Sequence, residues 1–174
     1  MPAAELAAVA LGVARSCTRT FASDPRNYDT AVGMKTDSLD RIRSSFELLS
    51  PHMAQMTRTF YERLFAARPD TRQLFKVDMD IQRQHFAAAL ALVVRNLGLL
   101  DALEEPLHEL GASHARVGVR PEHYPFVRDA MLKALAEALG PAWSSDLADD
   151  WRNLIETLAS HMLAGTLPAS DRLS

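Results

Sequence analysis

The sequence predicts an all-α protein with an N-terminal extension, and three observations lead to this fold class. From Thr36 onward, apolar side chains recur at the three- and four-residue spacing of an amphipathic helix. Capping residues and prolines stand where such segments begin. The strict alternation of polar and apolar residues that is typical of a strand is nearly absent. A chain of 174 residues can bury one sizeable helical core.

The chain divides into an extension, residues 1–36, a body, residues 37–167, and a short tail, residues 168–174. Alanine and leucine favour a helix over residues 4–15, and a turn is expected over residues 23–27. Two interpretations of the extension stay open. It is either a mobile arm, or a helix that packs on the body or on a partner.

The first two helices of the body are predicted from their N-terminal signals. Asp37 or Ser38 can cap a helix that runs to about Leu49. Ser50 followed by Pro51 is a strong start signal, because serine caps the backbone and proline suits the first helical position. The apolar residues of the second helix then keep helical spacing: Met53, Met56, Phe60 and Leu64.

A short helix and a longer one follow. The run of residues 68–70, with its proline, ends the second helix and begins a third that reaches Phe75. A loop is expected at residues 76–80. The next helix covers about residues 81–97 and stops near Gly98.

Prolines punctuate the rest of the body. Pro106 is expected to open the helix that carries His114, and Pro121 opens a long helix that Gly140 and Pro141 end. The last helix carries one apolar stripe, made of Leu147, Trp151, Leu154, Ile155, Leu158 and Met162.

Composition excludes several partners. The net charge of -3 does not indicate nucleic acid or an anionic membrane surface. The single cysteine, Cys17, excludes an internal disulfide framework. No apolar run is long enough to span a bilayer, and no basic residue precedes the mildly apolar stretch after Glu5. We therefore expect a cytoplasmic protein with no nucleic-acid or membrane partner.

The motifs of hydrolytic chemistry are missing. The sequence has no nucleophile elbow, no phosphate loop and no Cys-His cluster. The acidic pairs at residues 104–105 and 149–150 are interpreted as solvated faces. His108 and His114 are six residues apart, which is not the spacing of a metal pair on a helix, so zinc is not expected.

One imidazole can nevertheless bind a haem iron without a second histidine nearby, provided that it sits on a rigid helix in an apolar pocket. His114 meets this description. It ends a helical stretch, a glycine-containing corner follows it, and Leu107 and Leu110 precede it on roughly the same face.

Three runs in their order along the chain resemble the haem domain of flavohaemoglobins and the single-domain bacterial globins. Residues 119–124, which read Val-Arg-Pro-Glu-His-Tyr, are similar to the family's proline-led entry into its seventh helix. Residues 60–65 are similar to its second-helix run, and Leu74 with Phe75 to its third-helix corner. The resemblance covers the body of the chain and implies the globin fold, a three-over-three helical sandwich.

The resemblance also implies a site for one haem b. His114 falls where the family has its proximal iron ligand, and Phe75 where a phenylalanine wedges the haem. Tyr61 falls where a tyrosine faces the gas ligand. Gln82 falls at the distal polar position, and Phe86 one turn later is expected over the iron.

Four further residues complete the expected haem environment. Leu110, Val119 and Tyr124 are expected to contact the haem from the proximal side. His85 lies three residues after Gln82 and leaves three alternatives open. It contacts a haem propionate, it binds the iron as a sixth ligand, or it is a rim histidine in solvent.

The function that the resemblance implies is reversible binding of oxygen, nitric oxide and carbon monoxide, as in oxygen transport. Nitric oxide detoxification is the enzymatic expectation, and it would need an external reductase because the sequence ends at Ser174. The family usually has a glutamate late in its last helix, whereas Thr166 stands near that position here. This departure predicts a weaker electron push through His114.

Two other classes of function stay open. A haem-based gas or redox sensor would signal through the N-terminal extension. A cofactor-free helical interaction module would use the same apolar stripes as plain core. The sequence leaves the oligomeric state open.

Overall fold

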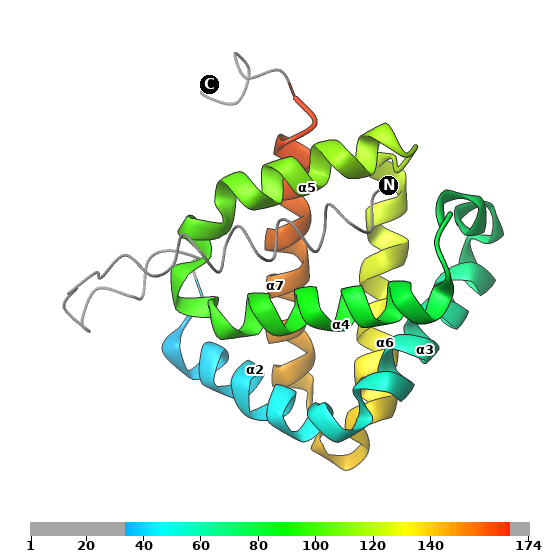
Figure 1. The fold of residues 1–174 in the computed structure, drawn as a ribbon. Coiled ribbons are helices and arrows are strands. Elements are labelled where there is room, and N and C mark those ends of the chain that lie inside the picture. The colour runs from blue at the N-terminus through cyan, green and yellow to red at the C-terminus, as the bar shows by residue number, and fades with distance from the viewer. Residues whose placement is uncertain (1–33, 168–174) are drawn as a thin grey trace.

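A computed structural model describes residues 34–167, and helices account for all regular structure in this part of the chain (Figure 1). The all-α prediction is therefore confirmed. The α-helices are α2 (Thr36–Leu49), α3 (Met53–Ala67), α4 (Met79–Arg95), α5 (Glu104–Arg116), α6 (Tyr124–Leu139) and α7 (Ser145–Ala164). Short 3-10 helices join them: η1 (Ser50–His52), η2 (Pro69–Leu74), η3 (Leu97–Leu103), η4 (Pro121–His123) and η5 (Gly140–Ala142).

The α-helices form two layers of three. Figure 1 shows α2, α4 and α5 crossing in front of α6 and α7, with α3 beside α6. The main contacts run between α3 and α6 and between α5 and α7, and α7 also packs on α2 and α6. This arrangement agrees with the expected three-over-three sandwich.

The predictions for residues 1–33 and for residues 168–174 lie outside the described residues. Met34, which the prediction places in the extension, is only 8% exposed and packs against the core. The predicted cap of the first helix is wrong, because Lys35 occupies the N-cap in an extended conformation and α2 begins at Thr36. Ser38 is buried instead, and its hydroxyl accepts a hydrogen bond from Arg41 at 3.2 Å.

Polar side chains cap the N-termini of α4 and α7. Asp78 caps α4, and its carboxylate accepts from the backbone N–H of Asp80 at 2.8 Å. Ser144 caps α7 by accepting from the N–H of Leu147 at 3.2 Å.

The prolines that are expected to open α-helices stand at other positions in the structure. Pro51, Pro69, Pro121 and Pro141 stand at the start of 3-10 turns, three of which lead directly or nearly so into an α-helix. Pro106 does not open its helix, because α5 begins two residues earlier at Glu104. A proline is tolerated there because the first N–H groups of a helix have no partner within the helix.

The core lies where α7 crosses the other helices. Trp151 and Leu154 of α7 are fully buried, together with Ile42 of α2 and Leu135 of α6. The indole N–H of Trp151 donates to the hydroxyl of Ser45 at 3.0 Å, so a buried hydrogen bond docks α2 on α7. None of the helices described has the length and apolar character needed to span a bilayer.

Candidate functional site

Tyr61 and Gln82 lie together, although they are 21 residues apart and come from α3 and α4. The side-chain amide of Gln82 donates to the hydroxyl of Tyr61 at 3.1 Å. Tyr61 is only 4% exposed, whereas Gln82 is half-buried. Because the phenol oxygen accepts from Gln82, the proton of its own hydroxyl is free to point to a third group.

Aromatic rings surround this pair. The ring of Phe75 meets that of Tyr61 edge-on, with centroids 5.4 Å apart, and the ring of Phe86 does so at 5.9 Å. Phe60 stacks on Phe86 at 4.7 Å, and Phe65 contacts both Tyr61 and Phe75. Edge-to-face contacts of this kind fix ring orientation as well as burying apolar area. We call these five residues the aromatic cluster.

The environment keeps Tyr61 in its neutral form. Burial raises the pKa of Tyr61 to about 12, against a smaller opposing effect of the hydrogen bond from Gln82. A neutral phenol retains its O–H, so Tyr61 is a hydrogen-bond donor throughout the physiological range.

His114 lies in the last turn of α5, and its ring is fixed to its own helix. Its Nδ1 atom is 2.8 Å from the carbonyl oxygen of Leu110. Because a carbonyl can only accept, Nδ1 carries the proton and Nε2 presents a free lone pair. Burial lowers the pKa of His114, which favours the neutral imidazole. A neutral imidazole with a free nitrogen is a metal ligand.

The corner after α5 holds this turn in place. Gly118 adopts a φ of 99°, a left-handed conformation that favours glycine. The N–H of Val119 then donates back to the carbonyl of His114 at 3.0 Å. A side-chain carbon added at Gly118 would come within 3.3 Å of Leu74, so η2 rests against this corner. Phe75 directly follows Leu74, which brings the aromatic cluster near the end of α5.

A second contact joins the same segments. His123 of η4 is buried, and its Nδ1 atom accepts from the N–H of Arg120 at 3.1 Å. Its Nε2 atom lies 3.9 Å from the carboxylate of Asp70 in η2. Arg68 binds that carboxylate with two hydrogen bonds of 2.8 and 2.7 Å, and this guanidinium lowers the pKa of Asp70 to about 2.

The remaining predicted residues are half-buried. We distinguish two groups of side chains, one around Tyr61 and Gln82 and one around His114 and the corner after α5. Leu110, Val119 and Tyr124 are half-buried on the side of α5 and its corner, and burial raises the pKa of Tyr124. On α4, the Nδ1 atom of His85 is buried, and no group in the described part of the chain bonds to it. The structure thus brings Tyr61 into contact with Phe75, Gln82 and Phe86, and His114 into contact with Leu110.

Two contacts between η2 and the segment after α5 link the two groups: Leu74 lies against Gly118, and Asp70 lies near His123. Helices α4 and α5, which carry Gln82 and His114, are joined by η3 and are not close-packed on each other.

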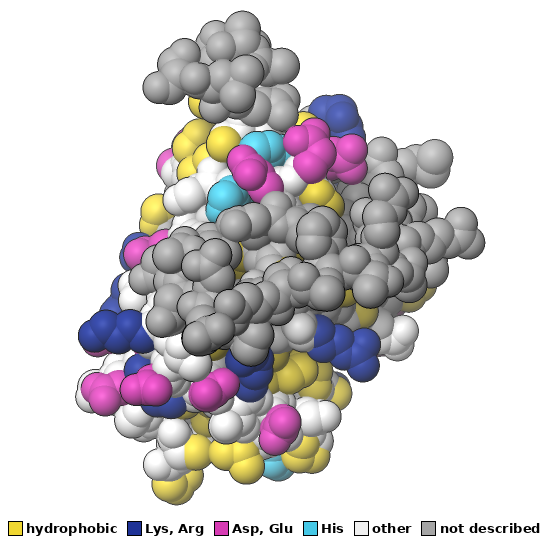
Figure 2. Space-filling view, turned by 90° about the vertical axis from the view of Figure 1, so that its left-hand side faces the viewer, with side chains coloured by type: hydrophobic (Ala, Val, Ile, Leu, Met, Phe, Trp, Pro, Cys, Tyr) yellow, Lys and Arg dark blue, Asp and Glu magenta, His cyan; other side chains and the backbone are white. Residues whose placement is uncertain are grey.

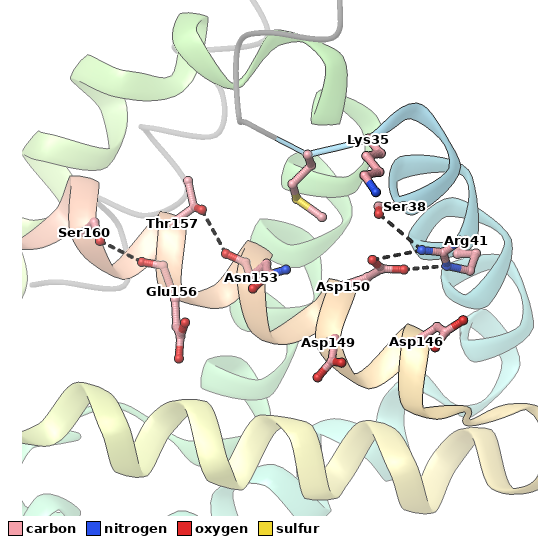
Figure 3. Close-up of a pocket in the computed structure, with 11 residues that line it drawn as sticks. Lys35, Ser38, Arg41, Asp146, Asp149, Asp150, Asn153, Glu156, Thr157 and Ser160 are labelled. Atoms are coloured by element: carbon pink, nitrogen blue, oxygen red, sulfur yellow. Dashed lines mark hydrogen bonds and ion pairs between the residues drawn. The ribbon is translucent and has the colours of Figure 1, made fainter.

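Sequence reasoning missed one buried carboxylate. Asp149 is exposed as predicted, but Asp150 is only 5% exposed, so the interpretation of this pair as a solvated face is wrong for Asp150. Arg41 of α2 donates to it twice, at 2.6 and 3.1 Å (Figure 3). The signal was present, because Asp150 stands at helical spacing between Leu147 and Leu154.

These residues belong to a polar groove between α2 and α7 of about 590 Å³. Figure 3 shows that its wall on α7 is made of successive polar side chains from Asp146 to Ser160. It holds no aromatic residue and no histidine. The groove is therefore unlike the apolar site around Tyr61 and His114.

A comparison with family models matches the globin family over residues 58–162, more than half of the chain. The chain is similar to an uncharacterized globin-like protein of Aquifex aeolicus, with 28% identity over 130 residues, 75% of this chain and 92% of that protein. It is 30% identical to the flavohemoprotein of Rhizobium meliloti over 129 residues, 72% of this chain. The matched part spans only 32% of that flavohemoprotein.

Solved structures have the same fold. One is an engineered carbene transferase, a putative nitric oxide dioxygenase from Rhodothermus marinus, with a TM-score of 0.66 and 29% identity over 76% of this chain and 93% of that one. Another is a bacterial globin from Campylobacter jejuni, with a TM-score of 0.63 and 23% identity over 76% of this chain and 96% of that one. The latter likeness concerns the fold alone.

Proposed function

Because the chain belongs to the globin family, we propose that it binds one haem b through His114 and reversibly binds diatomic gases there. The observation that carries this proposal is the hydrogen bond from Nδ1 of His114 to the carbonyl of Leu110. It fixes the tautomer and leaves the lone pair of Nε2 free, which is what a residue that holds a haem iron requires. When bound, haem would supply the iron to which oxygen, nitric oxide or carbon monoxide binds.

The residues present fit such a group. Haem is largely apolar, and half-buried apolar side chains from both helices, such as Phe86 of α4 and Leu110 of α5, can cover it. The buried Nδ1 atom of His85 has no partner in the described part of the chain. The ring as a whole is half-buried, and we propose that His85 lies at the haem edge, where its other nitrogen can reach a propionate.

Tyr61 is proposed to stabilise the gas ligand. Its oxygen already accepts from Gln82, so its own proton can be donated toward the ligand. Such a hydrogen bond contributes about 1–3 kcal/mol, or roughly ten- to a hundredfold in affinity. Oxygen becomes polarised when it binds ferrous iron and gains from this donor, whereas carbon monoxide gains less.

Nitric oxide detoxification is the enzymatic form of this proposal. It is supported by the likeness to flavohemoproteins and to a putative nitric oxide dioxygenase. The matched part of the chain covers a third of the flavohemoprotein, and we propose that a separate reductase supplies the electrons.

The proximal side favours gas binding over strong oxidative chemistry. Glu156 is the last glutamate of α7, and it is exposed, with its carboxylate accepting from Arg128 at 2.9 Å. Thr166 is also exposed, and its hydroxyl donates to the carbonyl of Leu163 at 2.7 Å. Neither residue supplies a carboxylate to polarise His114, so we expect weak peroxidase activity.

The visible spectrum of the purified full chain tests the proposal. We expect a Soret band that shifts when carbon monoxide is added to the ferrous protein. His114→Ala should lose most of its haem on purification, and added imidazole should restore part of the band. His52→Ala, which changes an exposed histidine at the start of α3, is the matched control and should keep the band. A wild-type spectrum and haem content in His114→Ala would show that the ligand is another residue.

A further inference from the structure

Three potential metal ligands meet where the start of α5 lies against the end of α7. Glu104 and His108 stand one helical turn apart on α5, and His161 lies in the last turn of α7. Each offers one ligand atom, and these atoms lie within 4.8 Å of one another. Figure 2 draws one face of the molecule, and histidine and carboxylate side chains lie side by side in its upper part. We call these three residues the α5–α7 cluster.

The two helices are locked together at this point. Gly165 follows α7, and any side chain there would overlap the backbone of His108. A side chain at Gly111 of α5 would likewise overlap the backbone of Met162. The backbones therefore touch at two points beside His108 and His161, and the imidazole rings of these two residues lie with their centroids 6.2 Å apart.

The spacing within the cluster suits a bound ion better than direct hydrogen bonds. Nε2 of His108 is 3.8 Å from the carboxylate of Glu104, beyond hydrogen-bonding distance. Two ligand atoms at about 2.0–2.1 Å from a tetrahedral zinc ion lie roughly 3.4 Å apart. Glu104 is exposed and His161 half-buried, so both side chains can rotate inward by the small distance required. His108 is buried and supplies the fixed ligand.

We propose that the α5–α7 cluster binds a zinc-type divalent cation, with Glu104, His108 and His161 as ligands. Two imidazole nitrogens and one carboxylate oxygen form a ligand set that zinc prefers, and they leave a fourth position for water. The ion would clip the start of the helix that carries His114 to α7. This site is distinct from the proposed haem site and does not depend on haem binding.

Zinc titration of the untagged full chain, freed of metal by a chelator, tests this proposal. A competing chromophoric chelator reports the affinity, and we expect one zinc ion per chain at this site. Glu104→Gln and His161→Ala should each weaken zinc affinity by at least about tenfold. The loss of a residue that only hydrogen-bonds to a metal ligand already lowers metal affinity by about that factor, and a direct ligand contributes more. Circular dichroism checks that the variants keep their helices.

Glu105→Gln is the matched control. Glu105 follows Glu104 directly and also lies 3.8 Å from His108, but it does not belong to the α5–α7 cluster. It should bind zinc like the wild type. Equal zinc affinity in the wild type, Glu104→Gln and His161→Ala would overturn the proposal, as would an equal loss in Glu104→Gln and Glu105→Gln.

X-ray absorption at the zinc edge provides a second measurement. The zinc-loaded wild type should show two imidazole ligands, and His161→Ala should show one fewer. Should His161→Ala fail to fold, Glu104→Gln remains informative, because Glu104 is an exposed residue. Retention of both imidazole signals in a folded His161→Ala variant, or loss of zinc binding in His114→Ala, would assign the ion to other residues.

Discussion

The hydroxyl of Tyr61 accepts one hydrogen bond and has its proton left to donate. Gln82 supplies the bond that it accepts, and the rings of Phe75 and Phe86 prevent the phenol from turning away. The orientation of the phenol ring is therefore fixed in advance, so the gas ligand of the proposed function would not need to reorganise this side of the pocket.

Removing that donor should change how fast oxygen leaves. Tyr61→Phe keeps the ring and loses only the hydroxyl, so we expect oxygen dissociation to accelerate by roughly ten- to a hundredfold. Association should change little, because the donor acts after the ligand has arrived. Stopped-flow measurement of both rate constants checks this expectation.

Carbon monoxide is the internal control for the same variant. Its dissociation should change much less, because it is less polarised than oxygen when bound to ferrous iron. Unchanged oxygen release in Tyr61→Phe would mean that Tyr61 does not face the ligand, and Gln82 alone would have to stabilise it.

At the scale of elements, α5 and α7 approach so closely that only glycine fits between them. Gly111 is buried in α5, and a Cβ atom there would overlap the backbone of Met162. Flexible side chains can move aside, but a backbone within a helix cannot do so unless the whole helix shifts.

Gly111→Ala therefore sets two effects against each other. Alanine favours a helix over glycine by about 1 kcal/mol. Overpacking costs about 1–3 kcal/mol, and more where the blocking atoms are backbone. We expect a net loss of about 1–2 kcal/mol, with the thermal midpoint falling by roughly 2–8 °C. Calorimetry of the variant and the wild type measures the two thermal midpoints.

Gly98→Ala is the matched control for that experiment. A Cβ atom at Gly98 would meet only the side chain of Arg43, at an ordinary contact distance of 3.7 Å. This variant should be neutral or slightly more stable. If both alanine variants are equally stable, the close approach of α5 and α7 is not a constraint.

A buried hydrogen bond from Trp151 to Ser45 joins α7 to α2, in addition to the bonds from Arg41 to Asp150. Ser45→Ala would leave the indole N–H of Trp151 without its partner, which costs about 1–3 kcal/mol. Ser44→Ala changes an exposed neighbour and should have little effect. Urea unfolding of both variants compares them, and equal midpoints would argue against this bond.

Local signals in the sequence predict most helices but few of the contacts between them. Helix α4 begins at Met79, two residues before the predicted start at Ile81, because Asp78 caps it there. The turn η3 was not predicted, because Leu97–Leu103 combines apolar residues with a kink at Leu99 that no Gly-Pro pair announces.

In the candidate site too, local motifs could be predicted from the sequence, whereas contacts between helices could not. The order of Tyr61, Phe75 and His114 along the chain was enough to suggest the family, because each stands in a recognisable local motif. The neighbourhood of His108 was not predictable, because His161 reaches it only through the crossing of α5 and α7. Spacing along one helix shows Glu104 beside His108, but it says nothing of a ligand from another helix.

At the scale of the whole molecule, stability should depend on alkaline pH through Tyr61. The pKa of Tyr61 is about 12 in the folded chain, against about 10 for an unperturbed phenol. Below pH 10 the phenol is neutral in both states and the full stability is present. Above it the unfolded chain loses the proton first, so the free energy of unfolding falls until the pH passes the folded pKa.

This loss should reach up to about 3 kcal/mol by pH 12 in the wild type. Tyr61→Phe removes it, so its unfolding free energy should decline less steeply between pH 10 and pH 12. Tyr124, whose pKa burial also raises, is present in both proteins and cancels in the difference. Parallel curves for the two proteins in urea unfolding would contradict a buried Tyr61.

The hydrogen bond from His114 to Leu110 has a mechanical meaning in this arrangement. Gly111, where α5 touches α7, lies within the same turn as these two residues. Because the backbone of His108 also touches Gly165, α5 is held at two points about one turn apart, and His114 follows directly after them. A force on the imidazole is therefore transmitted to the packed backbones of α5 and α7 instead of being absorbed by rotation of a side chain.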